Sequence, residues 1–205
     1  MNGKYTSALL STLLLLPVSI PGTGQTPQVR NFSRYDYMGG SQNWQIAQGE
    51  SGYLYFADNA GVLDYNGAEW TLHPALPGRS VRSLVYSPAD SCVYYAESNV
   101  LKRFSVAPQS SFVEETLFEG ASSGISEIWA LEKTADGLFF RDENALFRWG
   151  DDGLKRYSFR GRVDAIGVIG GQMLVCVRGE GLMRYADKQF VCKIPLAILF
   201  SSCHI

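Results

Sequence analysis

The sequence predicts an all-β fold, a partial β-propeller of about four four-stranded antiparallel blades that follows an N-terminal signal peptide. Three observations predict it. One unit occurs four times, each unit contains four short apolar runs separated by turn residues, and no segment sustains a helical period. Units of about 40 residues that each form a four-stranded sheet are typical of β-propellers. A β-sandwich is the alternative, but it requires no fixed repeat.

The first 24 residues have the order of a secretory signal peptide. Lys4 precedes an apolar run at 8–20, and the small residues Gly22, Thr23 and Gly24 follow. The run is shorter than the roughly 20 residues of a membrane span, although an uncleaved anchor is the alternative. We therefore expect residues 1–24 to be removed and the mature protein to be periplasmic. Residues 25–42 are expected to form a lead-in segment.

The repeat units are expected at residues 43–74, 81–118, 127–160 and 163–193, which together form the propeller region 43–193. An apolar anchor in the first run recurs at intervals of 38, 47 and 35 residues, at Ile46, Leu84, Leu131 and Ile166. An aromatic residue ends the third run of every unit, at Tyr65, Phe104, Trp149 and Tyr185. The second run is apolar on consecutive residues, which indicates a strand that is covered on both faces. The sheets should therefore be stacked.

The last residues, 194–205, form an atypical apolar tail that reads IPLAILFSSCHI. The tail has no charge and no turn residues that would close a blade. We therefore expect a fragment of a longer repeat protein. The alternative is a last strand that closes a small ring.

Three motifs lie within residues 31–70: NFSRYDY, QNWQIAQ and GYLYFADNAGVLDYNG. They resemble the opening of the periplasmic sensor region of bacterial regulators built from two-component-regulator propeller repeats. The likeness continues with falling strength to about Phe190. It implies more than four blades, followed by a β-sandwich module named for three tyrosines, a membrane-spanning helix, and a histidine kinase or helix-turn-helix output domain. None of these later parts is recognisable in the 205 residues.

Several classes of chemistry are not expected. The formal net charge is −2 with no basic block, so we expect no nucleic-acid partner. Beyond the signal peptide we expect no membrane span. The four cysteines show no CxxC pair and are expected to be free thiols, with a structural disulfide as the alternative. Two histidines are too few to support a zinc site. No metal and no cofactor are therefore predicted.

No catalytic residue is predicted either. Residues 120–124 match G-x-S-x-G, but a nucleophile elbow needs a strand before the serine and a helix after it. Paired carboxylates for glycoside hydrolysis could be sought among Asp58, Asp64, Asp142 and Glu180. Each of these lies in or beside a turn, where acidic residues are common.

A ligand face is predicted at one end of the propeller. Turns between strands two and three gather there with the loops that enter strand one. In the second unit, Ser98 and Asn99 are taken as the equivalents of Asp58 and Asn59. The candidate ligand-binding residues are Asp58, Asn59, Arg79, Arg82, Asn99, Trp129, Asp142, Asn144 and Arg178. Amides, charged groups and an aromatic ring suit a hydroxyl-rich ligand such as an oligosaccharide.

The predicted function is the glycan-responsive part of an exported sensor. Its partners would be an oligosaccharide and the missing blades or downstream signalling domains of a full-length regulator. One alternative is an exported propeller enzyme that acts on polysaccharide as a lyase or hydrolase. Another is a structural propeller that binds proteins.

Overall fold

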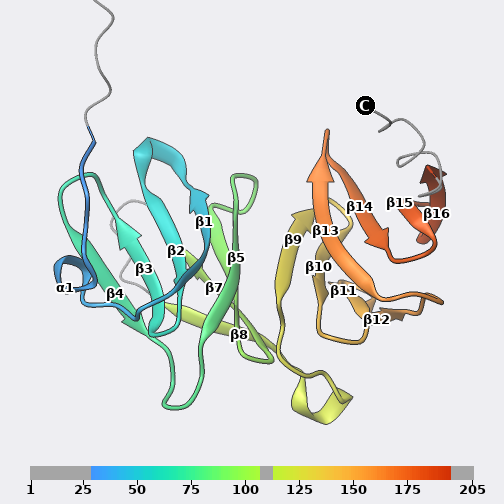
Figure 1. The fold of residues 1–205 in the computed structure, drawn as a ribbon, viewed down its shortest axis with the longest axis horizontal. Coiled ribbons are helices and arrows are strands. Elements are labelled where there is room, and N and C mark those ends of the chain that lie inside the picture. Colours follow the sequence, from blue (N-terminus) through green and yellow to red (C-terminus); the bar gives the residue numbers. More distant parts are fainter. Residues whose placement is uncertain (1–28, 107–112, 195–205) are drawn as a thin grey trace, which may run out of the picture. The chain divides into compact units, whose positions relative to one another are not determined.

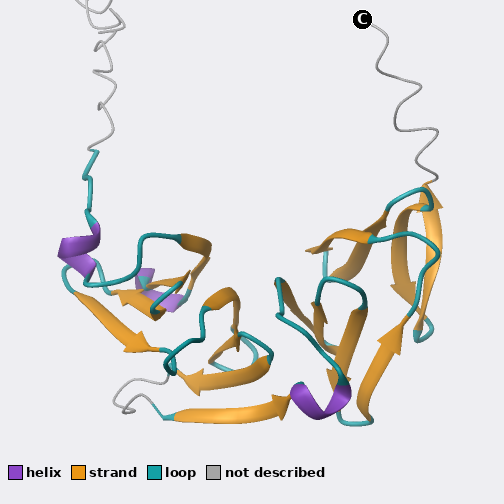
Figure 2. Cartoon of the chain, turned by 60° about the horizontal axis from the view of Figure 1, so that its bottom comes forward, coloured by secondary structure: helices purple, strands orange, loops and turns teal. Residues whose placement is uncertain are grey.

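The computed structural model describes residues 29–106 and 113–194. The predicted signal peptide lies outside the described residues, as does the predicted tail after Ile194. The described residues form sixteen strands in four sheets of four strands each, and every neighbouring pair is antiparallel (Figure 1). Strands dominate the drawing of secondary structure, and the few helices are short (Figure 2). This architecture confirms the predicted partial β-propeller.

Each sheet consists of four consecutive strands in chain order, and we call it a blade. The first blade holds β1 (Asn43–Gln48), β2 (Leu54–Asp58), β3 (Gly61–Tyr65) and β4 (Trp70–Pro74). The second holds β5 (Val81–Ser87), β6 (Cys92–Glu97), β7 (Val100–Ser105) and β8 (Glu114–Glu119). The third holds β9 (Ala130–Thr134), β10 (Gly137–Arg141), β11 (Leu146–Gly150) and β12 (Gly153–Tyr157). The fourth holds β13 (Val163–Ile169), β14 (Gln172–Val177), β15 (Gly181–Ala186) and β16 (Gln189–Ile194). The helices are α1 (Arg34–Tyr37) and the 3-10 turns η1 (Glu50–Gly52) and η2 (Ala121–Ser123).

The aromatic residues that mark the repeat occupy one register position. The residues opposite Tyr65, Phe104 and Trp149 on the second strand are Leu54, Val93 and Leu138. In the fourth blade Leu174 lies opposite Arg184, so Tyr185 is placed opposite Met173. Each of these partners stands four residues before the last residue of its strand or the residue directly after it, at positions 58, 97, 142 and 177. The repeat read from the sequence is therefore a repeat of strand register.

Apolar side chains fill the space between consecutive blades. Between the first and second blades the core includes Tyr55, Val62 and Leu84. Between the second and third it includes Leu101 and Phe140, and between the third and fourth it includes Phe139 and Val175. The innermost strands of neighbouring blades, β1 with β5, β5 with β9 and β9 with β13, also contact one another. Face-to-face contact between blades therefore supplies most of the buried apolar surface.

The burial of the second strand depends on the blade. All six residues of β6 are buried, because the second blade has a described neighbour on both faces. Along β14, buried residues alternate with more exposed ones, because a described blade covers only one face of that sheet. Consecutive burial was predicted for the second strand of every unit. It is confirmed for β6, while β14 follows the alternation of a sheet covered on one face.

An aromatic cluster joins the lead-in segment to the first blade. The ring of Trp70 lies 5.2 Å from that of Phe32, 5.4 Å from that of Tyr37 and 4.6 Å from that of Tyr65, measured between centroids. Helix α1 carries Tyr37, and a capping box between Ser33 and Asp36 begins this helix. Aromatic contacts of this kind add about 0.5–1.5 kcal/mol beyond area burial. The lead-in is thus held against β4.

Glu132 makes a testable contribution to stability at the third interface. It lies opposite Phe139 in β9 and β10, so its side chain shares the face that meets the fourth blade. Burial raises the pKa of Glu132 above its ordinary value, so the folded state disfavours the carboxylate. The ionised Glu132 therefore destabilises the folded state at pH values above its raised pKa. This destabilisation disappears below the unfolded-state pKa of about 4.3, where the carboxyl group is protonated in both states. We expect Glu132→Gln to raise Tm at pH 8, with a gain that shrinks towards pH 4.

Glu119→Gln is the matched control for this prediction. Glu119 is an exposed glutamate at the end of β8, so the substitution removes the same charge without changing burial. Thermal melts of both variants at pH 8 and pH 4 check the prediction. Equal changes in Tm for the two variants would mean that burial of Glu132 carries no penalty.

Candidate functional site

The turns after the second strands and the loops that enter the innermost strands meet at one end of each blade, which we call the funnel end. In Figure 1 the β2–β3 turn and the loop before β5 lie at the lower end of the drawing. At this end a turn carboxylate accepts a backbone N–H of the loop that enters the innermost strand in every blade. The pairs are Gly40 with Asp58 (2.6 Å), Leu76 with Glu97 (3.2 Å), Ser126 with Asp142 (3.2 Å) and Gly161 with Glu180 (2.8 Å). These bonds fix the loops.

The innermost strands share a bulge at the funnel end. The pairing of β1 with β2 shifts at Trp44, that of β5 with β6 at Arg82, and that of β13 with β14 at Asp164. Trp129 stands at the same position, directly before β9. A bulge redirects the side chain of its extra residue and is common next to binding sites. The position is therefore filled by Trp, Arg, Trp and Asp along the four blades.

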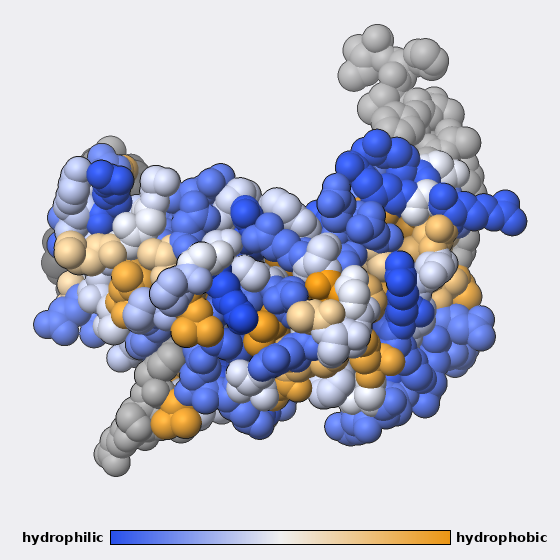
Figure 3. Space-filling view, turned by 90° about the horizontal axis from the view of Figure 1, so that it is seen from below, coloured by the Kyte–Doolittle hydropathy of each residue, from blue (hydrophilic) through white to orange (hydrophobic). Residues whose placement is uncertain are grey.

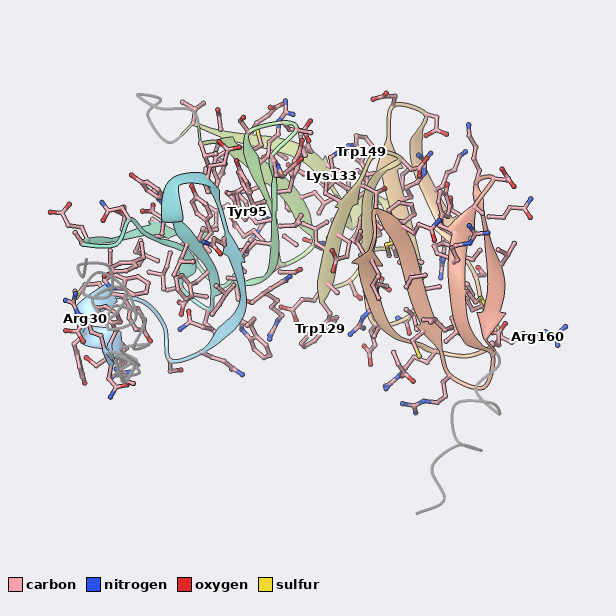
Figure 4. The ribbon with its side chains drawn as sticks, turned by 90° about the horizontal axis from the view of Figure 1, so that it is seen from above. Arg30, Tyr95, Trp129, Lys133, Trp149 and Arg160 are labelled. Atoms are coloured by element: carbon pink, nitrogen blue, oxygen red, sulfur yellow. The ribbon has the colours of Figure 1, made fainter. Side chains whose placement is uncertain are left out.

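Three of these residues form what we call the tryptophan–arginine stack: Trp44, Arg82 and Trp129. The guanidinium carbon of Arg82 lies 4.3 Å from the ring centroid of Trp44 and 4.4 Å from that of Trp129. The two indole rings are 6.1 Å apart and nearly perpendicular. Trp129 is labelled in Figure 4, where it lies between the first and third blades. A cation held between two rings joins three blades at one point.

Neighbouring polar groups hold the stack in place. The Nε–H of Arg82 donates to Glu127, and the same carboxylate accepts the hydroxyl of Ser80 at 3.2 Å. The indole N–H of Trp44 donates to the side-chain oxygen of Asn59 at 2.7 Å. Even so, 37% of Trp44 and 39% of Trp129 is exposed to solvent. The stack is thus a fixed aromatic surface that is open to solvent.

The funnel end is a largely polar face. Figure 3 views the lower end of the drawing in Figure 1, and hydrophilic residues cover most of that face, with apolar residues in small areas among them. Isolated aromatic rings among hydrogen-bonding groups are the arrangement that sugar rings require, because a sugar has an apolar face and a rim of hydroxyls.

The structure brings together some of the predicted ligand residues. Asn59, Arg82 and Trp129 meet through Trp44. Arg178 lies in the fourth blade, where it binds Asp164 at 3.0 Å. These four predicted residues therefore share the funnel end with the bulge positions.

The other predicted residues have different surroundings. Asp58 and Asp142 are 0% and 3% exposed. Backbone N–H groups donate to both oxygens of Asp142 but to only one oxygen of Asp58, whose other oxygen has no hydrogen-bond partner among the described residues. Asn99 donates to the carbonyl of Ile125 at 3.4 Å, and Arg79 lies 3.8 Å from Glu97. These residues are placed to shape loops. Asn144 is exposed, and its backbone N–H donates to Asp142.

Sequence reasoning missed several residues at this end. Trp44 and Glu127, which belong to the stack or bind it, and Asp164 with its partner Arg162, at the bulge of the fourth blade, were not among the candidates. The sequence does contain a pattern that marks the bulge positions. Each bulge residue stands two residues before an apolar anchor, at 44, 82, 129 and 164. The expected equivalence of Ser98 with Asp58 was also wrong by one residue, since register aligns Glu97 with Asp58.

A second concavity lies at the opposite end, between the second and third blades. It has a volume of about 500 Å³, and its lining includes Asp90, Tyr94, Arg103, Lys133 and Trp149. Lys133 and Trp149 are labelled in Figure 4. Its polar groups bind each other or close neighbours. The Tyr94 hydroxyl donates to Asp90 at 2.9 Å, and the Lys133 ammonium lies 3.5 Å from the same carboxylate. These polar groups of the lining are therefore already paired.

The other sequence motifs have plain structural surroundings. Residues 120–124, the G-x-S-x-G match, form η2 in the loop between β8 and β9, as expected for an inter-blade loop. Cys92 is a buried free thiol whose pKa is raised by burial, and Cys176 is a partly buried free thiol. In residues 29–106 and 113–194, no group of three or more His, Cys, Asp or Glu is arranged to hold a metal ion. No helix in these ranges is long and apolar enough to cross a bilayer.

Comparison with solved structures identifies similar folds. The extracellular domains of two hybrid two component systems from B. thetaiotaomicron superpose with TM-scores of 0.54 and 0.56, at 18% and 12% sequence identity. The alignments cover 73% and 80% of this chain, which spans only 22% and 26% of those chains. A gluconolactonase from Xanthomonas campestris superposes with a TM-score of 0.52 at 14% identity, over 75% of this chain and 62% of that one.

These likenesses establish the fold class, because identities this low carry no more than the fold. Extracellular domains of two-component systems are among the neighbours, and this is the class of protein that residues 31–70 resemble. No protein family and no curated protein matches the sequence. The chain is therefore a set of propeller blades of the kind that such extracellular domains contain.

Proposed function

We propose that this chain is the ligand-binding part of an exported propeller sensor and that it binds an oligosaccharide at the funnel end. The tryptophan–arginine stack is the observation that carries the proposal. Two indole rings keep more than a third of their surface exposed although they are held by Arg82, Asn59 and Glu127. Exposed rings that are already fixed lose little entropy on binding, so they suit a saccharide ligand.

The sensor role rests on two independent supports. Residues 31–70 resemble the sensor region of two-component-regulator propellers, and the fold is similar to extracellular domains of hybrid two component systems. Because this chain spans about a quarter or less of those domains, further blades and signalling domains are its proposed partners. The same resemblance supports a periplasmic location for the mature chain.

A binding role is favoured over hydrolysis because the four candidate carboxylates already have structural partners. Asp58, Asp142 and Glu180 accept backbone N–H groups, and Asp64 lies 2.6 Å from the ring nitrogen of His73. Glycoside hydrolysis needs two carboxyl groups that face each other across a substrate. Incubation of the chain with xylan, galactan and pectin should therefore release no new reducing ends.

Removal of either tryptophan of the stack should weaken saccharide binding by about two- to tenfold. Stacking on an aromatic face contributes roughly 0.5–1.5 kcal/mol beyond burial, and 1.4 kcal/mol corresponds to a factor of ten. Calorimetric titration of the chain with neutral xylan and galactan oligosaccharides, repeated with Trp44→Ala and Trp129→Ala, checks this. Thermal melts establish that both variants are folded.

Trp149→Phe is the control variant, because Trp149 lines the concavity at the opposite end. Its affinity for saccharide should match that of the unmodified chain. Loss of binding in Trp149→Phe with normal binding in the two stack variants would move the site to that concavity. A folded chain that binds none of the saccharides would contradict the proposed function and favour a protein-binding propeller.

A further inference from the structure

The fourth blade carries a fixed pair of arginines at the funnel end. The guanidinium of Arg178 donates from Nε and Nη2 to the two oxygens of Asp164, at 3.1 and 3.0 Å. Arg162 donates from Nε to one of the same oxygens at 3.0 Å. Hydrogen bonds from Arg178 and Arg162 hold the pKa of the Asp164 carboxyl below its usual range. We call Arg162 and Arg178 the arginine pair.

The pair is oriented but not enclosed. Side-chain exposures are 61% for Arg162 and 64% for Arg178, against 31% for the aspartate between them. A guanidinium carries five N–H donors in a planar fork, and the bonds to Asp164 engage Nε and Nη2. The outer donors of both forks therefore face solvent while their stems are held. An anion could bind these donors without breaking the bonds to Asp164.

A third arginine strengthens the positive field at this point. Burial lowers the pKa of Arg141, and the nearby charge of Arg162 lowers it further. The Nε of Arg141 is buried and has no hydrogen-bond partner among the described residues. The carboxylates nearby are those of Asp164, Asp142 and Glu180, and the last two accept backbone N–H groups. An anion would therefore meet the exposed N–H donors of Arg162 and Arg178, which are the cations of this group that remain open to solvent.

The arginine pair and the stack occupy equivalent places on neighbouring blades. Asp164 occupies in the fourth blade the bulge position that Trp129 occupies in the third. The backbone N–H of Trp129 donates to the carbonyl of Arg141 at 2.9 Å, and Arg141 in turn senses the charge of Arg162. Facing sheets are about 10 Å apart, so a short oligosaccharide can reach both places.

We propose that the arginine pair binds the carboxylate of an acidic saccharide, a uronate, while a neighbouring sugar ring of the same molecule rests on Trp129 and Trp44. This deepens the proposed function and rests on it. The planar, two-oxygen carboxylate matches the fork of a guanidinium, which is why arginine is common wherever carboxylates are recognised. The sensor is thereby specific for acidic over neutral glycans.

The test compares tetragalacturonic acid with its fully methyl-esterified form, which has the same sugars and linkages but no charge. Calorimetry on the whole chain should give an affinity for the acid about 10- to 100-fold higher than for the ester. The double variant Arg162→Gln, Arg178→Gln should bind the acid only as well as the ester. Arg156→Gln, which changes an exposed arginine of β12, should leave the preference intact.

The two proposals fail in different ways. Equal affinities of the unmodified chain for acid and ester, or an acid preference that survives the double variant, would overturn the arginine pair as a carboxylate site. Absence of any binding by the acid would overturn it as well. Neutral oligosaccharides that still bind through Trp44 and Trp129 would leave the proposed function standing in each of these cases.

Discussion

Replacement of Lys102 by methionine is expected to lower the free energy of unfolding by about 3 to 5 kcal/mol, because the buried Glu97 carboxylate keeps only the more distant guanidinium of Arg79, 3.8 Å away, as a cation. The Lys102 ammonium donates to Glu97 at 2.6 Å and to Glu114 at 2.7 Å within the second blade. Glu97 is only 2% exposed. Although burial opposes it, hydrogen bonds to Glu114 and Glu97 raise the pKa of Lys102.

Equilibrium unfolding in urea measures this change, and two further variants make it specific. Lys155→Met removes a lysine from an exposed ion pair with Asp152, and it should cost less than about 1 kcal/mol. The double variant Lys102→Met, Glu97→Gln removes the ammonium and the buried charge together, so it should recover much of the lost stability. A loss in Lys102→Met no larger than that in Lys155→Met would show that solvent reaches Glu97.

This buried network has a role at the funnel end as well. Glu97 accepts the backbone N–H of Leu76 in the loop that enters β5. Arg82 is the second residue of β5, directly after this loop. The position of one member of the stack is therefore linked to an ion pair inside the second blade. A ligand surface on loops can be rigid when buried side chains of the blade bind the loop backbone.

The sequence was sufficient to predict the blades, since their apolar pattern and strand register repeat together. The recurring aromatics Tyr65, Phe104, Trp149 and Tyr185 align by their spacing along the chain, and they occupy equivalent pairs in the four sheets. Burial differences between blades were harder to predict. The alternation along β14 depends on which sheets lie beside it, and no property of β14 itself specifies that.

The candidate site was predicted only in part, for two physical reasons. Trp44 lies inside a strand, where an aromatic residue is read as core, and the strand pairing shows a bulge at this residue that the residue type alone does not reveal. An acidic turn residue is also ambiguous, because the sequence does not reveal whether backbone N–H groups will surround it. Asp142 and Asn144 looked alike as turn residues, yet one is buried and the other exposed.

Asp142→Ala separates a structural role from a ligand role at this turn, and we expect it to lower the free energy of unfolding by about 2 to 4 kcal/mol. One carboxylate oxygen accepts the N–H groups of Asn144 and Ala145, both at 2.8 Å, and the other accepts that of Ser126 at 3.2 Å. A buried donor left without its partner costs roughly 1–3 kcal/mol. Urea unfolding of the variant measures the loss.

Asn144→Ala is the matched control, because the turn uses only the backbone N–H of this exposed residue. Its stability should change by less than about 0.5 kcal/mol. If Asp142 only supports the turn, the folded molecules of Asp142→Ala should bind saccharide as well as the unmodified chain does. Any apparent loss of affinity should then be explained by the smaller fraction of folded protein. An Asp142→Ala variant of normal stability that has lost saccharide binding would instead make this carboxylate a ligand contact. The loop before β9 would then have to be held by interactions other than the bond from Ser126 to Asp142.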